Sequence, residues 1–187
     1  MLEKIKNTYK KILKWDNQYS ERLFLSESLI FHRKIASFFA HSGDSWFLLA
    51  GLFFLWLFSK GQTHTYSALF AGAILIQASF VIALKFLIKR SRPEGNWGSV
   101  YRNTDPNSFP SGHAVRVVML AAMAWGLGLF PLNWVLTLWA PLVSFARVML
   151  GVHFLTDIIA GWALGILLAI CILLLQPFFF KFFAFVF

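Results

Sequence analysis

The sequence predicts an all-α membrane protein: a polytopic bundle of about five transmembrane helices, preceded by amphipathic and interfacial helices at the N-terminus. Of the 187 residues, 58% are hydrophobic and only 13% are charged, whereas soluble domains have roughly 45–50% apolar and about 25% charged residues. Five apolar runs follow one another at lengths near that of a membrane-spanning helix. The single cysteine, Cys171, excludes an intrachain disulfide framework and a multi-cysteine zinc site.

The N-terminal region, residues 1–42, is expected to lie at the membrane surface. Apolar residues recur at roughly helical spacing over residues 2–13, with five lysines among and just after them. This pattern is typical of a basic amphipathic helix on a lipid surface; the alternative is a solvated helical lead-in. We expect residues 23–40 to be interfacial rather than spanning, because four polar residues interrupt this apolar stretch, namely Glu27, His32, Arg33 and Lys34.

A transmembrane domain is predicted over residues 43–177. Its apolar runs are Trp46–Phe58, Tyr66–Leu84, Ala114–Phe130, Leu132–Ala146 and Ile158–Leu175. The first and fourth runs are shorter than the ~17–25 residues of a typical spanning helix, so they need flanking residues to cross. The Phe-rich residues 178–187 are expected to form a C-terminal tail that is too short to span.

The charge balance indicates a phosphate-bearing partner. Seventeen Lys and Arg against eight Asp and Glu give a formal net charge of +9, which in a soluble protein would favour nucleic acid. Here little polar surface is left for such an interface, and the basic residues cluster near the ends of the apolar runs. Anionic lipid headgroups or a phosphorylated substrate explain that placement better, so we expect a lipid partner and no nucleic acid.

Polar clusters lie at one end of each of the last four apolar runs. Residues 85–93 end the second run, 110–113 begin the third, Arg147 ends the fourth and 153–157 begin the fifth. Because successive spans alternate in direction, all four clusters fall on the same side of the membrane. This placement follows from the order of the runs alone.

The first cluster carries cations that suit an oxyanion. Lys85 and Arg92 are seven residues apart, about two helical turns, so they lie near one face if the helix continues that far. The alternative is that Lys and Arg extend toward water from the end of a span, and for Lys89 and Arg90 we favour that interpretation.

The second cluster, residues 110–113, immediately precedes an apolar helix. Ser111 is of a favoured N-cap type, and the free N–H groups at a helix N-terminus bind anions. Gly112 lets the backbone approach an oxyanion closely, and His113 can deliver a proton near neutral pH. The alternative is an ordinary capped helix with an interfacial histidine.

The third cluster combines Arg147 with His153 and Asp157. The last two are four residues apart and share a helical face if the helix has begun by His153. A carboxylate on one imidazole nitrogen leaves the other basic, which makes a nucleophile; a structural His–Asp cap is the alternative. We expect neither a metal nor a cofactor at His113, His153 and Asp157, because the nearby cations would repel a divalent ion and attract phosphate, namely Lys85, Arg92 and Arg147.

In this order the clusters match K-x6-R-P at 85–93, P-S-G-H at 110–113 and R-x5-H-x3-D at 147–157. Over about residues 43–175 the chain resembles the type 2 phosphatidic acid phosphatase superfamily. The resemblance implies a metal-independent lipid phosphatase that hydrolyses a phosphomonoester or diphosphate through a phosphohistidine. Its candidate substrates are undecaprenyl diphosphate, phosphatidylglycerol phosphate, phosphatidic acid and lipid A 1-phosphate. Ala146 stands where the family usually has serine, which removes a hydroxyl contact to phosphate.

The resemblance also implies a role for each motif residue. His153 attacks phosphorus, Asp157 orients it, and His113 protonates the leaving oxygen and then activates water. The equatorial oxygens are held by Lys85, Arg92, Ser111, Gly112 and Arg147. Two other interpretations stay open: a lipid phosphotransferase that uses the same site, and a non-catalytic lipid-binding membrane protein.

Arg116 is not explained by the motifs. It follows His113 by three residues within an apolar run, and an ionisable residue inside a membrane helix is a functional candidate by default. We hypothesise that it contacts a second phosphate or a polar headgroup. The alternative is an arginine paired with Glu94, Asp105 or Asp157.

Two arguments disagree about which side of the membrane carries the site. Eight basic residues between Lys4 and Lys34 share its side, against only Lys60 and Lys181 on the other, and the positive-inside rule then points to the cytoplasm. The resemblance to bacterial lipid phosphatases implies a bacterial inner membrane with the site facing outward, and this is the expectation we adopt.

Overall fold

The structure, a computed structural model, describes residues 2–93 and 105–187. Within these ranges the helices are α1 (Leu2–Leu23), α2 (Ile30–Ser42), α3 (Ser45–Phe58), α4 (Gln62–Ile88), α6 (Gly112–Gly126), α7 (Leu132–Met149) and α8 (Leu155–Phe182). The β-structure of this part is one isolated bridge, between Ser91 and Asn107. The predicted all-α class is confirmed.

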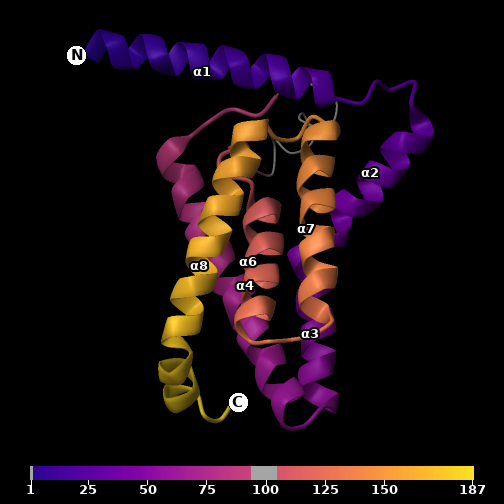
Figure 1. The fold of residues 1–187 in the computed structure, drawn as a ribbon, viewed down its shortest axis with the longest axis vertical. Helices are drawn as coiled ribbons and strands as arrows, with labels where there is room; N and C mark the ends of the chain where they lie inside the picture. The colour runs from indigo at the N-terminus through magenta and orange to yellow at the C-terminus, as the bar shows by residue number, and fades with distance from the viewer. Residues whose placement is uncertain (1, 94–104) are drawn as a thin grey trace.

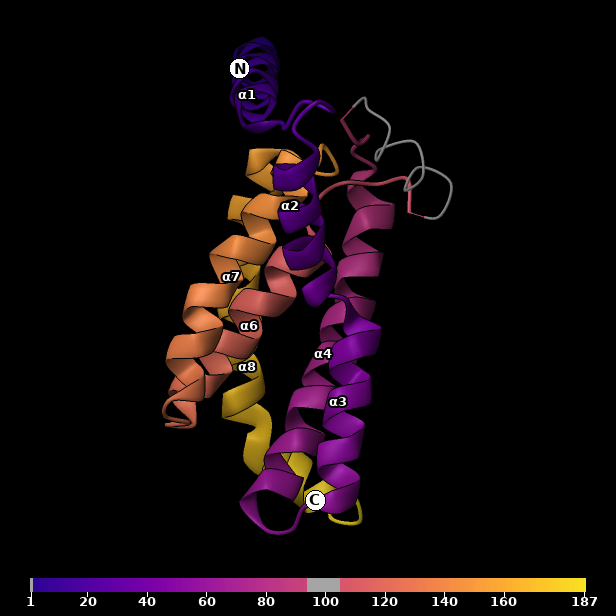
Figure 2. The same ribbon diagram turned by 90° about the vertical axis from the view of Figure 1, so that its right-hand side faces the viewer.

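Three of the described helices, α4, α7 and α8, are each long and apolar enough to cross a membrane. The α2 and α3 helices reach that length only together, as a pair bent by 50°. Figures 1 and 2 show this pair running from the end of the bundle near α1 to the opposite end. The stretch expected to be purely interfacial therefore leads into the first apolar run. The remaining apolar helix, α6, is shorter, at 15 residues.

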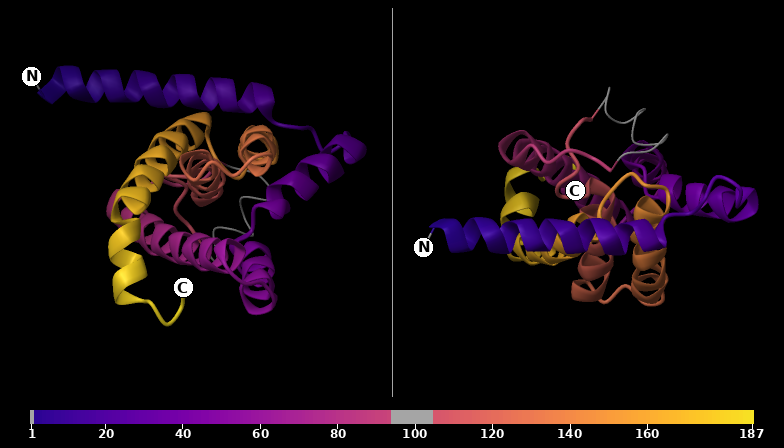
Figure 3. Two further views of the ribbon diagram at one scale, coloured as in Figure 1. Left: turned by 60° about the horizontal axis from the view of Figure 1, so that its bottom comes forward. Right: turned by 90° about the horizontal axis from the view of Figure 1, so that it is seen from above.

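The α1 helix lies across one end of the bundle (Figures 1 and 3). At this end α4 and α7 finish and α8 begins, while the chain termini lie at opposite ends (Figure 1). The segments that carry the four polar clusters thus meet on one side, as the alternation of the runs predicts.

The central helix of the bundle is α6, which is buried along most of its length between α7 and α8 (Figure 3). Two glycines of α8 allow its backbone to pack closely against the backbone of α6. A Cβ added at Gly165 would lie 2.6 Å from the carbonyl oxygen of Val115, and one at Gly161 would lie 2.9 Å from Cβ of Ala114. Small residues at such crossings let membrane helices pack closely. The crossing fixes the beginning of α8 beside the beginning of α6.

The outer surface of the bundle is apolar, as a lipid-facing surface must be. Large side chains on α4 and α8 remain exposed, for example Leu87 at 78% and Leu174 at 76%. At the far end, α8 continues through Pro177, so the predicted Phe-rich tail begins inside this helix. The last residues then return to α3, where Val186 O accepts a hydrogen bond of 2.8 Å from Trp56 Nε1.

Candidate functional site

A cavity of about 200 Å³ lies among the ends of α4, α6 and α7 and the loop before α8. Its lining includes the imidazole, cationic and glycine residues that the motifs predict, together with the unexplained arginine: Lys85, Arg92, Gly112, His113, Arg116, Arg147 and His153. Residues from four separate segments of the sequence thus surround one small space. Of the nine predicted site residues, only Ser111 and Asp157 lie behind the lining.

Ser111 caps α6 rather than lining the cavity. Its hydroxyl accepts a hydrogen bond of 3.5 Å from Ala114 N, and its own N–H donates to Asp157 O at 3.1 Å. The predicted N-cap is therefore present, and the fully buried Ser111 ties the beginning of α6 to that of α8.

His153 and Asp157 do meet, but the condition for a shared helical face, a helix that has begun by His153, is not met. The α8 helix begins only at Leu155, so the two residues do not share a helical face. Instead Asp157 is the third residue of the helix and reaches back, as acidic residues at this position do. Its Oδ2 accepts from Phe154 N at 3.0 Å and lies 3.3 Å from His153 Nδ1.

The surroundings of His153 fix its tautomer. Arg92 Nη1 lies 3.1 Å from His153 Nε2, and a guanidinium can only donate hydrogen bonds. Nε2 therefore carries the lone pair, and Nδ1 carries the proton that faces Asp157. Burial, reinforced by the charges of Arg92, Arg147 and Lys85, holds the pKa of His153 well below its usual value. The imidazole is thus neutral, and the lone pair of Nε2 accepts a hydrogen bond from Arg92.

Lys85 and Arg92 also come together by a route other than the predicted one. The α4 helix ends at Ile88, and Lys89 follows in the left-handed conformation with φ of 53°. The two cations therefore do not share a helical face; they converge on the carboxylate of Asp105. Lys85 Nζ pairs with its Oδ2, and Arg92 Nη2 lies 2.7 Å from the same oxygen. An oxyanion already occupies the point where these cations meet.

Arg90 does not simply extend toward water from the end of a span, as the sequence analysis favoured. Its guanidinium donates to Asp157 Oδ1 at 2.8 Å, pairs with Asp16 of α1 and lies 4.2 Å above the ring of Phe154. Asp157 therefore binds Arg90 through one oxygen and His153 through the other. Arg90 belongs to the support of the predicted nucleophile.

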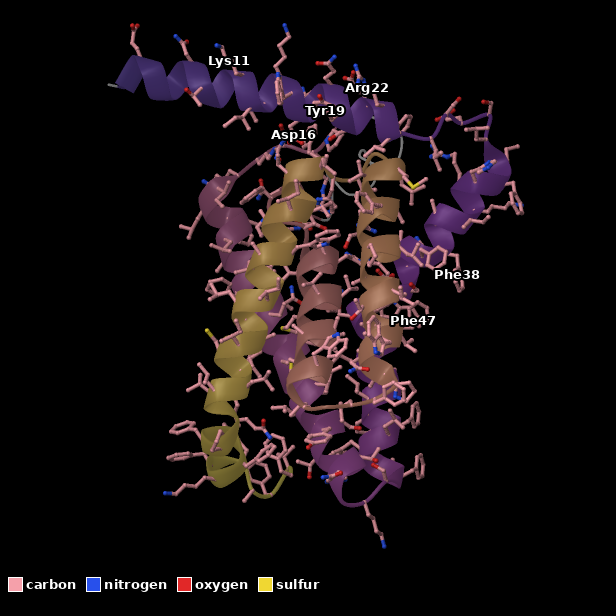
Figure 4. The ribbon with its side chains drawn as sticks, viewed as in Figure 1. Lys11, Asp16, Tyr19, Arg22, Phe38 and Phe47 are labelled. Carbon is pink, nitrogen blue, oxygen red and sulfur yellow. The ribbon has the colours of Figure 1, made fainter. Side chains whose placement is uncertain are left out.

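The α1 helix completes this support from outside the bundle. Asp16 Oδ1 accepts from Thr156 N at 3.0 Å, and Ser20 Oγ accepts from Leu155 N at 2.9 Å. Figure 4 shows Asp16 on the side of α1 that faces the bundle. Because the first N–H groups of α8 have no partners within the helix, these two buried residues of α1 cap it.

A second cavity, of about 450 Å³, lies between α1 and the loop before α8. Its lining includes Ser20 of α1 and Phe24, which follows this helix, and it shares Arg92 and His153 with the first cavity. The imidazole of His153 therefore stands between two spaces, although its exposed fraction is only 1%.

His113 has a carboxylate partner that sequence analysis did not identify. Its Nε2 lies 2.6 Å from Oδ1 of Asp44, at the bend between α2 and α3, and Oδ2 of the same carboxylate lies 3.0 Å from His41 Nδ1. Asp44 precedes the first apolar run, 69 residues before His113, and no local pattern links the two.

Arg116 makes no ion pair with Asp105 or Asp157, so that part of the alternative interpretation is wrong; Glu94 lies outside the described residues. Its Nη1 donates to Gly43 O at 2.6 Å, and its buried Nε has no hydrogen-bond partner among the described residues. Arg116 lines the same cavity as the motif residues.

Ala146 has a packing role here. It is 2% exposed and belongs to an apolar cluster with Ala36 and Ala40 of α2. Over the described residues, no three His, Cys, Asp or Glu side chains are grouped so that they could hold a metal ion.

Comparison with known proteins agrees with the motifs. The family model described as the PAP2 superfamily matches residues 65–181, more than half of the chain. The chain is 38% identical over 109 residues to an undecaprenyl-diphosphatase of Sulfolobus acidocaldarius, covering 49% of each protein. It is 35% identical over 96 residues to a decaprenylphosphoryl-5-phosphoribose phosphatase of Mycobacterium tuberculosis, covering 51% of this chain and 52% of that one. The chain thus spans about half the length of the curated relatives it matches.

Two solved structures share the fold. One is a transmembrane PAP2-type phosphatidylglycerolphosphate phosphatase from Bacillus subtilis, with a TM-score of 0.68, 24% identity, and 89% of this chain and 87% of that one covered. The other is LpxE of Aquifex aeolicus, with a TM-score of 0.61, 26% identity, and 76% of this chain and 86% of that one covered.

Proposed function

Because the chain belongs to the PAP2 superfamily, we propose that it is an integral membrane phosphatase that hydrolyses a lipid phosphate through a phosphohistidine. The observation that carries this proposal is the lining of one cavity by His113, His153 and three cations, Lys85, Arg92 and Arg147. Phosphoryl transfer depends mainly on positioning and on stabilising the charge of the equatorial oxygens, and these side chains supply both.

In the first step, His153 Nε2 attacks phosphorus. A P–N bond forms, the bond to the leaving oxygen breaks, and His113 gives that oxygen its proton, so that a lipid alcohol or monophosphate departs. Asp157 holds the proton on Nδ1 and stabilises the imidazolium that forms. The equatorial oxygens are bound by Lys85, Arg92, Arg147 and the N–H of Gly112. For this, phosphate replaces Asp105 on the cations, and Arg92 turns from Nε2 of His153 to a phosphate oxygen, which frees the lone pair for attack.

In the second step, His113, now neutral, takes a proton from water. The water attacks phosphorus, the P–N bond breaks, and inorganic phosphate leaves while His153 returns to its neutral form. No step needs a metal ion. Because attack in line with the P–N bond needs water on the face opposite His153, the water takes the place left by the lipid oxygen, beside His113.

The position of the site supports a membrane lipid as the substrate. The cavity lies at the end of an apolar bundle, so the phosphate of a lipid would enter it while the tail stays among the helices. Undecaprenyl diphosphate, phosphatidylglycerol phosphate, phosphatidic acid and lipid A 1-phosphate all have this form. Arg116 lines the same cavity, which supports the hypothesis that it contacts a second phosphate or a polar headgroup. If it does, Arg116→Gln loses more activity on a diphosphate lipid than on a monophosphate; equal losses would remove this role.

The test is phosphate release from each of these lipids in detergent with EDTA present. We expect release in the chelator from wild-type protein and from Lys89→Gln, which changes an exposed cation. His153→Ala should abolish it. Undiminished release in His153→Ala would remove the proposed nucleophile, and the absence of release from all four lipids in the wild type would contradict the function.

We further propose a bacterial inner membrane with the site facing outward. The lysines that argue for the cytoplasm belong largely to α1, an interfacial helix at the site's end (Figure 1), which can bind anionic headgroups in either leaflet. Single-cysteine variants of the Cys171→Ser protein test the side. A membrane-impermeant reagent on intact cells should label Ser26→Cys, between α1 and α2, and not Gln62→Cys, at the opposite end; the reverse pattern would place the site inside.

A further inference from the structure

We propose that Asp44 is the positioning residue of His113, and that the bend between α2 and α3 exists to hold it there. The inference rests on the proposed function, since it concerns the residue that exchanges the proton with the leaving group and with water. It adds to the site a side chain from outside the three motifs and from outside the residues that the family model matches.

The first support is what Asp44 does not do. It occupies the N-cap position of α3 with an extended backbone, where aspartate is among the favoured residues because its carboxylate can accept the free N–H groups of the helix. Yet its side chain makes no capping hydrogen bond. Both oxygens turn away from α3 instead, one to His113 Nε2 at 2.6 Å and one to His41 Nδ1 at 3.0 Å.

The second support is the packing of the bend against His113. A Cβ added at Gly43 would lie 2.8 Å from Val143 Cγ1 and 3.4 Å from Cδ2 of the His113 ring, so glycine is needed for this approach. The carbonyl oxygen of Gly43 accepts a hydrogen bond of 2.6 Å from Arg116 Nη1. Arg116 sits one turn after His113 on α6, so the helix that presents the imidazole also holds the peptide before Asp44.

The contact with Asp44 determines which ring nitrogen of His113 exchanges the catalytic proton. With Asp44 Oδ1 accepting from Nε2, the Nε2 proton is retained and Nδ1 becomes the nitrogen that gives and takes the catalytic proton. In the first step the Nδ1–H proton passes to the leaving oxygen as its bond to phosphorus breaks. In the second step the same Nδ1 accepts a proton from the attacking water. Asp44 stays ionised throughout and steadies the imidazolium form.

Asp44 could act through His113 or could only stabilise the bend between α2 and α3. Substrates with different leaving groups distinguish these two roles. An alkyl alcohol leaves as a strong base and needs a proton, whereas an aryl alcohol leaves readily without one. If Asp44 acts through His113, Asp44→Asn should lower kcat on an alkyl lipid phosphate by about 10–100-fold, as the loss of a residue that orients a catalytic group does. On para-nitrophenyl phosphate the phosphorylation step should be nearly unaffected. A bend that is simply distorted would lower both rates alike.

The experiment measures burst-phase rates of phosphorylation on both substrates for wild type, Asp44→Asn and Asp44→Glu. Glu3→Gln, which neutralises an exposed acid of α1, is the matched control and should behave as wild type on both. Asp44→Glu keeps the charge and should recover most of the activity that Asp44→Asn loses. In a His113→Asn background, Asp44→Asn should add no further loss, because the residue it acts through is already gone.

Equal losses on the two substrates, or an added loss in the His113→Asn background, would overturn the role of Asp44 and leave the proposed phosphatase intact. If the wild type hydrolyses neither substrate, the proposed function itself fails. If Asp44→Asn does not fold, Asp44→Glu is compared with wild type on both substrates. Phosphorylation rates that fall by the same factor on the alkyl and the aryl substrate would contradict the inference.

Discussion

The two histidines of the cavity are held in opposite ways. His153 meets its carboxylate, Asp157, within four residues of the chain, and the contact is made through Nδ1. His113 meets Asp44 across 69 residues, through Nε2. The proposed mechanism therefore uses Nε2 of the first and Nδ1 of the second. The comparison teaches that a local motif can specify the proposed nucleophile together with its partner, whereas the partner of the proposed acid–base residue is supplied only by the tertiary fold.

The largest difference between the two histidines should appear on replacement. His153→Ala removes the atom that we propose to bond to phosphorus, so we expect phosphate release from alkyl and aryl substrates alike to fall by at least about 10⁴-fold. His113→Ala removes only the proton exchange, and its loss on an alkyl lipid phosphate should be about 10²–10⁴-fold.

The substrates distinguish the two effects. Phosphorylation by para-nitrophenyl phosphate should partly survive in His113→Ala and not at all in His153→Ala. If both variants lose the same factor on both substrates, the division of labour between them is wrong.

The second prediction concerns the support of His153. Arg90→Gln removes the ion pairs that join Asp157 to Asp16 of α1, and we expect kcat to fall by about 10–100-fold with little change in KM. Lys89→Gln, one residue away and exposed, is the control and should leave kcat within about twofold. A change in KM alone would instead make Arg90 a substrate-binding residue.

The third prediction is a shift in pH dependence. Burial and three cations hold the pKa of His153 below its usual value, so the neutral nucleophile persists into mildly acidic solution. Arg92→Gln removes one of those charges and should raise this pKa, since a positive neighbour no longer opposes protonation. The acid limb of the kcat/KM profile should therefore move to higher pH. The position of the limb is the readout, because the overall rate also falls with the loss of a phosphate ligand.

The smallest effect should come from the helix crossing that brings the two histidines together. Gly165→Ala would place a Cβ 2.6 Å from Val115 O, so α6 and α8 must separate slightly, at a cost of about 1–3 kcal/mol. We expect a lower melting temperature in detergent and a modest loss of activity. Gly72→Ala, in α4, meets no atom within 4 Å and should not lower the melting temperature.

Much of the site could be predicted from the sequence because each motif is short and lies where a helix begins or ends. The alternation of spans placed Lys85, His113, Arg147 and His153 on one side, and the structure brings them to one cavity. The helical faces assumed for Lys85 with Arg92 and for His153 with Asp157 were wrong, because α4 ends and α8 begins within the motifs themselves. Lys85 and Arg92 are instead joined by Asp105, and His153 is contacted by Asp157, which extends back from the first turn of α8.

The missed residues share a different property. Asp16, Asp44 and Arg90 each find their partners on distant segments, and their own neighbours in the chain give no sign of it. From its sequence, the lysine-rich α1 resembles a surface helix, whereas in the structure its Asp16 and Ser20 cap α8. The bent pair α2–α3 was likewise hidden, since polar residues within α2 obscure its continuity with the first apolar run.

The most direct test of the central claim is to locate the phosphoryl group during turnover. Rapid quenching into alkali preserves phosphohistidine, and peptide mass spectrometry then identifies the modified residue. We expect the phosphoryl group on His153 in the wild type, and a longer-lived phosphorylated form in His113→Ala, which lacks the base that activates water. Phosphate found on another residue, or turnover of the lipid by His153→Ala, would contradict the roles assigned to the two histidines.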